Sequence, residues 1–284
     1  MTAASLPTPL VSPEQLLAAH AGGSAPLIID CSFDLGDPGA GERAFEEGHL
    51  PGAIYAHLDR ELAGAKTGRN GRHPLPALGD WAETLARLGV TPERAVVLYD
   101  AQGGMYAARA WWMLRWIGHA AASVLDGGLH AWKATGGALE TGAMMAAAAG
   151  SAYPIGESAV RMVDAETLLK SLGRVTLLDA RAAERYRGEV EPLDRRAGHI
   201  PGARSRFFKD NLDAQGRFRP AAELRAMFES FGAAPAQVVH QCGSGVTACH
   251  NLLAMEVAGL TGSALYPGSW SEWSSDPARP VALG

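Results

Sequence analysis

The loop Cys-Gly-Ser-Gly-Val-Thr at residues 242–247 is the part of the sequence best suited to covalent chemistry. It follows a short apolar run and precedes a helical pattern over residues 248–258. Gly243 and Gly245 permit a tight turn in which several backbone N–H groups point at one place, and the positive end of the following helix lies there too. Because such a site stabilises a thiolate or a larger anion, the loop predicts a nucleophilic Cys242.

The other two cysteines are Cys31, which follows an apolar run, and Cys249, which lies inside the helical pattern. We interpret both as core residues, the usual role of an unpaired cysteine. An odd, sparse set of cysteines favours a reducing compartment over a disulfide scaffold, and the absence of a Cys-x-x-Cys pair argues against structural zinc.

The elements that must position the loop occur twice along the chain. Four landmarks recur in the same order: an apolar run ending in Asp at 27–30 and 176–179, the motifs GHLPGA at 48–53 and GHIPGA at 198–203, a second apolar run at 95–99 and 237–241, and a Gly–Trp cluster at 126–132 and 267–273. The repetition predicts two copies of one domain, over 1–140 and 160–284, joined by an Ala/Gly/Ser-rich linker at 141–159.

Within each copy, short apolar runs alternate with helical patterns. Helices are expected to begin after Ser12, with Pro13 in the first turn, and after Asp164 as the N-terminal cap. Strands that alternate with helices predict a parallel sheet covered on both faces. The expected fold class is therefore α/β, with two similar domains, each built on a central parallel sheet of about five strands.

Composition narrows the function classes. The 284 residues carry a net charge of −5 and no basic run, which argues against a nucleic-acid partner. No apolar stretch reaches the roughly 18 residues of a membrane span. The N-terminus also lacks the basic region and apolar run of a signal peptide. We therefore expect a cytoplasmic protein that acts on small molecules.

The loop CGSGVTA, the paired GHLPGA and GHIPGA motifs and the terminal GSWSEW resemble the tandem-domain rhodanese superfamily. The loop is similar to that of the 3-mercaptopyruvate sulfurtransferases, whereas thiosulfate sulfurtransferases usually have Arg and Lys in place of Gly243 and Ser244. The resemblance implies a catalytic second domain, in which Cys242 carries sulfur as a persulfide. It also implies an inactive first domain, whose matching turn at 100–104 has no cysteine.

The resemblance also implies a donor-binding site. Arg185 takes the place of a substrate-binding arginine, whose planar fork suits a carboxylate. The loop residues expected to surround the donor are Gly243, Ser244, Gly245, Val246 and Thr247. The family's second arginine lies in a Glu-Pro-Arg context, and this chain has Leu193 at that place, so Arg195 or Arg196 is the expected substitute.

A proton relay is a further implication of the resemblance. It would join Ser244 to His73 and Asp59, so that an oriented histidine supplies the proton that the departing pyruvate enolate needs. Two simpler interpretations stay open. His73 lies in a Pro-rich loop and could be an exposed polar residue, and the Ser244 hydroxyl could bind the donor without any relay.

Several other polar and aromatic residues are expected to serve the structure. His49 and His199 precede the same Pro-Gly turn in both copies, including the copy without a loop cysteine, so we expect each to stabilise its turn. Arg181 follows Asp179 closely and is expected to hold the second domain together. Trp270 and Trp273 are expected to cover the end of that domain or to pack in its core.

The expected activity is transfer of sulfur from 3-mercaptopyruvate to a thiol, a thioredoxin-like protein or cyanide, in two covalent steps and without a metal or organic cofactor. Two alternatives remain: a thiosulfate-specific enzyme, and a non-catalytic carrier that receives its persulfide from another enzyme. A phosphatase or arsenate reductase loop of the form C-x5-R is excluded, because Ala248 stands where that loop needs arginine.

Overall fold

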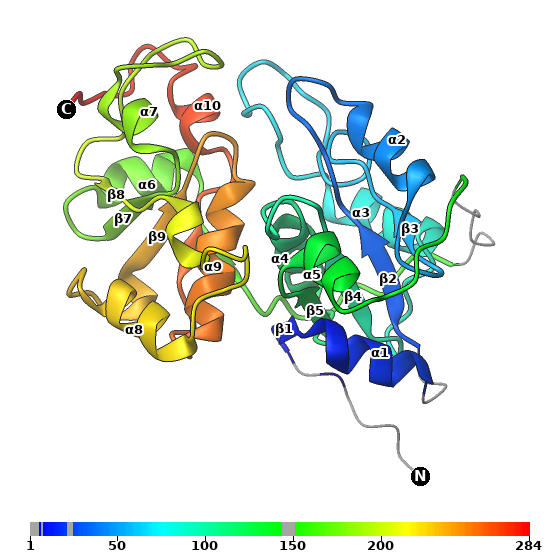
Figure 1. The fold of residues 1–284 in the computed structure, drawn as a ribbon. Coiled ribbons are helices and arrows are strands. Elements are labelled where there is room, and N and C mark those ends of the chain that lie inside the picture. The colour runs from blue at the N-terminus through cyan, green and yellow to red at the C-terminus, as the bar shows by residue number, and fades with distance from the viewer. Residues whose placement is uncertain (1–5, 7, 22–24, 144–150) are drawn as a thin grey trace. The chain divides into compact units, whose positions relative to one another are not determined.

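The computed structural model describes residues 6, 8–21, 25–143 and 151–284, so residues 144–150 of the predicted linker lie outside the described part. The chain forms two compact units (Figure 1). The first unit consists of Met1–Ala63, Pro76–Ala159 and Ala214–Arg217, and the second of Gly64–Leu75, Val160–Asp213 and Phe218–Gly284. The segment 64–75, which lies between two parts of the first unit in the sequence, thus belongs to the second unit.

The first unit alternates strands and helices along the chain. Its elements are β1 (Leu10–Val11), α1 (Pro13–Ala21), β2 (Leu27–Asp30), α2 (Ala40–Glu47), β3 (Ile54–Tyr55), α3 (Leu78–Arg87), β4 (Val96–Tyr99), α4 (Ala107–Trp116), β5 (Ala122–Leu125) and α5 (Gly128–Ala134).

The second unit repeats this order with two short 3₁₀ helices added. Its elements are β6 (Arg161–Met162), α6 (Ala165–Ser171), β7 (Thr176–Asp179), α7 (Ala183–Arg187), β8 (Arg204–Ser205), η1 (Phe208–Asn211), α8 (Ala221–Glu229), η2 (Pro235–Gln237), β9 (Val238–Gln241), α9 (Thr247–Val257), β10 (Ala264–Leu265) and α10 (Ser269–Trp273).

The two sheets have the same topology. The strand orders are β1-β5-β4-β2-β3 and β6-β10-β9-β7-β8, and every pairing is parallel. The register of the central pair is also the same, with Asp30 opposite Tyr99 in the first unit and Asp179 opposite Gln241 in the second. The predicted fold class and the predicted duplication are confirmed.

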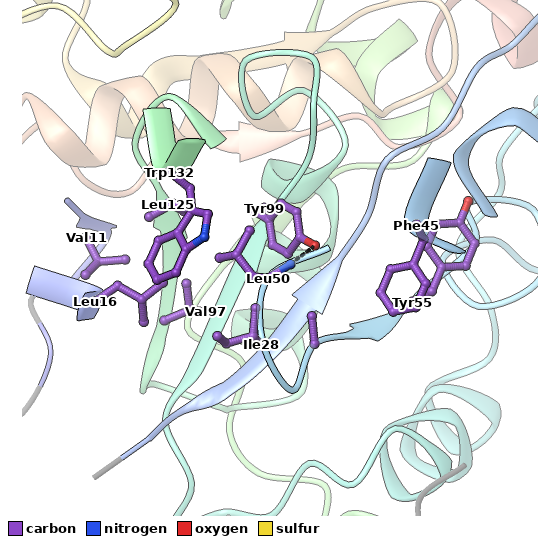
Figure 2. Close-up of a cluster of buried hydrophobic side chains, with 11 residues drawn as sticks. Val11, Leu16, Ile28, Phe45, Leu50, Tyr55, Val97, Tyr99, Leu125 and Trp132 are labelled. Atoms are coloured by element: carbon purple, nitrogen blue, oxygen red, sulfur yellow. Dashed lines mark hydrogen bonds between the residues drawn. The ribbon is translucent and has the colours of Figure 1, made fainter. Parts of the chain in front are cut away.

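The central strands are short apolar runs because helices cover both faces of a parallel sheet. All four residues of β2, β4 and β9 are buried. Figure 2 shows the core of the first unit, where the backbone N–H of Leu50 donates to the Tyr99 hydroxyl at 3.2 Å. This bond ties the GHLPGA motif to the last residue of β4.

The expected structural roles of the paired histidines are confirmed. His49 Nδ1 lies 2.7 Å from the Phe45 carbonyl oxygen, and its ring stacks on the Phe45 ring at a centroid distance of 3.8 Å. His199 repeats both contacts with Tyr186, at 2.9 Å and 4.0 Å. Each histidine therefore locks the preceding helix to its Pro-Gly turn.

Other predicted roles are also confirmed. The Asp164 side chain caps α6 by accepting from the Thr167 N–H at 2.7 Å. The Arg181 guanidinium binds the Asp179 carboxylate, with its shortest contact 2.7 Å, and donates to the Gly198 carbonyl at 2.7 Å. Trp270 and Trp273 are fully buried in the core of the second unit.

The segment 64–75 is attached to α10 at the end of the second unit. The Arg72 N–H donates to the Ser271 hydroxyl at 2.9 Å. Gly71 has a φ of +89°, and a Cβ atom there would come within 2.9 Å of the Gly268 carbonyl oxygen. A side chain at position 71 would therefore push Arg72 and His73 away from α10.

No helix in the described residues combines the length and apolar character needed to cross a membrane.

Candidate active site

The loop that carries Cys242 begins where the central strand β9 ends. Cys242 is 1% exposed, and its Sγ accepts the Gly245 N–H at 3.2 Å. Gly245 has a φ of +77°, and a Cβ atom there would lie 2.2 Å from the Pro267 carbonyl oxygen, so only glycine fits. The loop then enters α9, whose positive end faces the same turn. The predicted strand–loop–helix geometry is therefore present.

Helix α10 holds the loop from the other side. The Trp270 N–H donates to the Cys242 carbonyl at 3.0 Å, and the Ser271 N–H donates to the Gly243 carbonyl at 2.8 Å. The Cys242 N–H donates to the Ser269 hydroxyl at 3.1 Å, and that hydroxyl donates to the Tyr266 carbonyl at 2.9 Å. Three backbone groups of the loop are thus fixed by α10.

Ser269 adopts an unusual backbone conformation. Its φ of +53° lies in the left-handed region, which is unfavourable for any residue with a side chain. Its counterpart at the start of α5 is Gly128, with a φ of +55°. The second unit therefore has a serine where the first has glycine, and the added hydroxyl is the group that accepts the Cys242 N–H.

In the first unit, the equivalent turn surrounds the carboxylate of Asp100. Asp100 follows β4 as Cys242 follows β9. Its carboxylate accepts backbone N–H groups within 3.0 Å from four residues: Gln102, Gly104, Tyr106 and Ala107. A turn at this position of the fold therefore directs several N–H donors at one anion.

Two guanidinium groups lie over the loop at Gly243. A Cβ atom on Gly243 would be 3.0 Å from Arg72 Nη2 and 3.4 Å from Arg185 Nη1. Both side chains are positioned by Asp194, which accepts from Arg72 Nη1 at 2.7 Å and from Arg185 Nη2 at 3.1 Å. Within the described residues, the buried Nε of each arginine has no hydrogen-bond partner. The nitrogen of each arginine nearest to Gly243 is also a different one from the nitrogen that donates to Asp194.

The charges around these arginines balance. Ion pairs join three guanidinium groups to three carboxylates: Arg72, Arg181 and Arg185 to Asp179, Glu191 and Asp194. Burial raises the pKa of Asp194, and the neighbouring charge of Arg72 opposes that effect. With every group ionised the cluster is neutral, so it does not attract a dianion by net charge.

The loop serine meets one of its two expected partners. The Ser244 hydroxyl lies 2.8 Å from His73 Nδ1, and both side chains are buried. His73 is therefore not the exposed residue that its Pro-rich context left open. Asp59 belongs to the first unit, where its backbone N–H donates to His57 Nδ1 at 3.1 Å. A relay that includes Asp59 stays a prediction.

The remaining predicted residues take different places. Val246 is buried at the start of α9, and Thr247 is the first residue of that helix. Arg195 lines a separate pocket, and the Arg196 guanidinium is bound to backbone carbonyl oxygens of residues 274, 276 and 279. Neither arginine is among those near Gly243.

The sequence reasoning missed three residues of this site, namely Arg72, Asp194 and Ser269. Arg72 immediately precedes His73, and Asp194 immediately follows Leu193, so both lie beside positions that the motifs had already marked. Ser269 is part of the GSWSEW motif, where alignment with the Gly-Gly of the first copy would have shown the serine at a glycine position.

Comparison with known proteins agrees with this arrangement. The rhodanese-like domain family matches residues 12–135 and 164–276. A probable 3-mercaptopyruvate sulfurtransferase of Pseudomonas aeruginosa is 47% identical over 281 residues, covering 95% of this chain and 96% of the relative. A putative thiosulfate sulfurtransferase, SseB, of Mycobacterium tuberculosis is 39% identical and covers 97% of each chain.

Solved structures give the same relationship. The 3-mercaptopyruvate sulfurtransferase SseA of Escherichia coli is 30% identical, has a TM-score of 0.78 and covers 94% of this chain and all of that one. The family match and the long relatives above 30% identity agree with the duplicated fold and the single loop cysteine. The chain therefore belongs to the rhodanese-like sulfurtransferases, with two rhodanese-like domains of which the second carries Cys242.

Proposed function

We propose that this protein transfers sulfur from 3-mercaptopyruvate to a thiol acceptor through a persulfide on Cys242. The observation that carries the proposal is the pair of guanidinium groups over Gly243, beside a loop with no charged side chain. One carboxylate can accept from both guanidinium groups, and the forked geometry of arginine suits that contact. The names of the Pseudomonas and Escherichia relatives support the same donor.

In the first step, the Cys242 thiolate attacks the donor sulfur. The carbon–sulfur bond breaks, the sulfur and its proton stay on Cys242 as a hydropersulfide, and the bonding electrons leave with pyruvate as its enolate. Arg72 and Arg185 hold the carboxylate throughout. The loop N–H groups, including that of Gly245, stabilise the anionic persulfide after it loses its proton.

The enolate needs one proton to become pyruvate. The His73–Ser244 contact of 2.8 Å supplies a path for that proton beside the reacting sulfur. We propose that the proton moves from His73 through the Ser244 hydroxyl to the enolate carbon, with Asp59 as the predicted third member.

In the second step, an acceptor thiolate takes the outer sulfur and Cys242 leaves as a thiolate. Small thiols, cyanide and a thioredoxin-like protein are the proposed acceptors. Two successive covalent steps on one cysteine predict ping-pong kinetics. A cytoplasmic location is part of the proposal, and it is supported by three buried cysteines that form no disulfide with one another.

Thiosulfate is the second candidate donor. The name of the Mycobacterium relative and the leucine at the family's second arginine position both favour it. The neutral charge cluster opposes it, because a dianion gains from a net positive site. A non-catalytic persulfide carrier is the other alternative.

The deciding experiment compares kcat/KM for 3-mercaptopyruvate and thiosulfate with one shared acceptor. We expect the mercaptopyruvate value to be higher by at least about tenfold, the effect of about 1.4 kcal/mol in transition-state binding. A higher value for thiosulfate would reverse the donor assignment, and no turnover with either donor would favour the carrier.

A further inference from the structure

A second pocket, of about 600 Å³, opens in the second unit outside the catalytic loop. Three segments line it: residues 67–69, Arg195, and part of the stretch 275–279. None of the residues 242–247 lines it, and neither Arg72 nor Arg185 does. Its volume lies in the range of pockets that bind small organic molecules, about 300–1,000 Å³.

The walls of this pocket are fixed by hydrogen bonds. The Arg196 guanidinium donates to the carbonyl oxygens of Ser274, Asp276 and Arg279 at 3.2, 2.9 and 3.1 Å, which joins two of the walls. The third wall, residues 67–69, is held in its turn by the side chain of Asn70. That side chain accepts the Thr67 N–H at 2.8 Å and donates to the Ala65 carbonyl at 2.9 Å. The pocket is therefore formed before any ligand arrives.

The lining of the pocket is cationic. It carries the guanidinium groups of Arg69, Arg195 and Arg279 and the single carboxylate of Asp276. That carboxylate already pairs with Arg279 at 3.6 Å. Within the described residues, the side chains of Arg69 and Arg195 form no ion pair. Two uncompensated guanidinium groups in a chain of net charge −5 indicate a ligand that carries carboxylates.

Two lining residues of the pocket lie close in the sequence to residues that hold the donor site. Arg195 directly follows Asp194, which pairs with both arginines over Gly243. Ser275 lies four residues beyond Ser271, whose N–H binds the Gly243 carbonyl, and four residues of chain span at most about 14 Å. A ligand of tripeptide size that extends from the pocket past Asp194 would bring a thiol toward Cys242.

We infer that this pocket binds the sulfur acceptor, a small thiol that carries two or more carboxylates. The inference rests on the proposed function, and it adds the chemical class of the acceptor. The donor carboxylate belongs to Arg72 and Arg185, while Arg69 and Arg195 hold the acceptor. The acceptor thiolate attacks the outer sulfur of the Cys242 hydropersulfide, the bond between the two sulfurs breaks, and Cys242 leaves as a thiolate, so no oxidant is consumed.

The test isolates the second half-reaction. The protein is first converted to its persulfide with 3-mercaptopyruvate, the excess donor is removed, and mass spectrometry verifies the added sulfur on Cys242. Transfer is then measured to glutathione, which carries two carboxylates, to 2-mercaptoethanol, which carries none, and to reduced thioredoxin. The variants are Arg69→Gln, Arg195→Gln and both together, with Arg225→Gln, an exposed arginine on α8, as the matched control.

We expect the double variant to transfer sulfur to glutathione about tenfold more slowly at low glutathione, with 2-mercaptoethanol transfer changed less than about twofold. Arg225→Gln should leave both rates unchanged. Unchanged glutathione transfer, or equal losses with both thiols, would overturn the inference. So would a loss confined to reduced thioredoxin, since that result assigns the pocket to an acidic protein surface.

A failure of the proposed function is visible separately, because no persulfide would then form on Cys242. In that case, glutathione is titrated calorimetrically into Cys242→Ser protein with and without the two arginine substitutions. Binding that the substitutions weaken would still support a carboxylate site, and absence of binding would overturn it.

Discussion

Asp100 and Cys242 occupy the same place in the two units, each directly after the central strand of its sheet. The Asp100 carboxylate accepts four backbone N–H groups within 3.0 Å, whereas Cys242 Sγ accepts one, from Gly245 at 3.2 Å. In the first unit, the N–H groups of the turn are thus bound by the carboxylate of Asp100. In the second unit, we expect the N–H groups of the turn to serve the Cys242 thiolate. After reaction they would serve the negative charge on the outer sulfur of the persulfide.

This contrast supports the proposal that catalysis takes place in the second unit alone. The four N–H groups that already donate to the Asp100 carboxylate are not available to a substrate anion. Cys242 accepts fewer of the turn's N–H groups, so the persulfide can gain hydrogen bonds as it forms. Stabilisation that appears only as the reaction proceeds is the kind that accelerates it.

Arg72 is predicted to be the second donor-binding cation. Arg72→Gln should lower kcat/KM for 3-mercaptopyruvate by about 10- to 100-fold, because a charge-assisted hydrogen bond contributes about 1.5–3 kcal/mol. The effect should fall mainly on KM and should be smaller for a donor ester without the carboxylate. Steady-state kinetics with both donors measure the difference.

A second experiment introduces an arginine at position 193 in place of Arg72. Leu193 stands where the family's second arginine is expected, next to Asp194, and is 45% exposed. Leu193→Arg in the Arg72→Gln background should recover part of the lost kcat/KM. If Arg72→Gln affects donor and ester equally, or Leu193→Arg gives no recovery, Arg72 does not bind the carboxylate.

His73 and Ser244 are predicted to act as one proton path. His73→Gln and Ser244→Ala should each lower kcat for 3-mercaptopyruvate by about 10²-fold, and the double variant should be little worse than either single one. Thiosulfate is the control donor, since sulfite leaves without needing a proton, and its slower turnover should be unchanged. Equal losses with both donors would instead assign these residues to loop structure. Asp59→Asn tests the third member by the same comparison.

We predict that the backbone conformation of Ser269 lowers the stability of the protein, while its hydroxyl holds Cys242 in position. Ser269→Ala keeps the left-handed φ and leaves the buried Cys242 N–H unpaired, so it should lower the free energy of unfolding by about 1–3 kcal/mol. Ser269→Gly loses the same hydrogen bond but relieves the strain, and should be about 1 kcal/mol more stable than the alanine variant. Both should form the persulfide more slowly than the unaltered protein. Urea unfolding and single-turnover kinetics test this, and equal stability of the two variants would show that position 269 is not strained.

His240 should make the stability of the protein sensitive to acid. Burial, with a smaller contribution from the charge of Arg206, lowers the pKa of His240 to about 3. The unfolded chain takes up this proton near pH 6.5, so between these values the unfolded state binds more protons and stability falls as the pH falls. From pH 7 to pH 5 this group alone should cost about 2 kcal/mol. Urea unfolding of the protein and of His240→Leu at both pH values measures it, and an identical pH dependence in the two would contradict the assignment.

Much of the fold could be predicted from the sequence because each signal is local. The strands Leu27–Asp30 and Thr176–Asp179 have the bounds that their apolar runs indicate, and Val238–Gln241 begins one residue later than its run. The loop glycines permit the turn around Cys242, and the duplicated motifs indicate two copies of one domain. These features depend on neighbours in the sequence.

The rest of the site depends on distant parts of the chain. Arg72 reaches Gly243 only because the segment 64–75 packs on the second unit, through a hydrogen bond to Ser271 nearly two hundred residues away in the sequence. The pattern around Leu193 pointed to Arg195 or Arg196 as substitutes, but Arg196 is bound to backbone carbonyl oxygens and Arg195 lines another pocket. Such long-range placement leaves no periodic trace in a single sequence.

The central claim is that Cys242 carries the sulfur. The most direct measurement is mass spectrometry of the protein after brief treatment with 3-mercaptopyruvate and removal of the excess donor, followed by peptide mapping under non-reducing conditions. We expect one added sulfur atom per chain, on the peptide that holds Cys242, lost on addition of an acceptor thiol and absent from Cys242→Ser. Full turnover by Cys242→Ser, or an added sulfur on Cys31 or Cys249 instead, would contradict it.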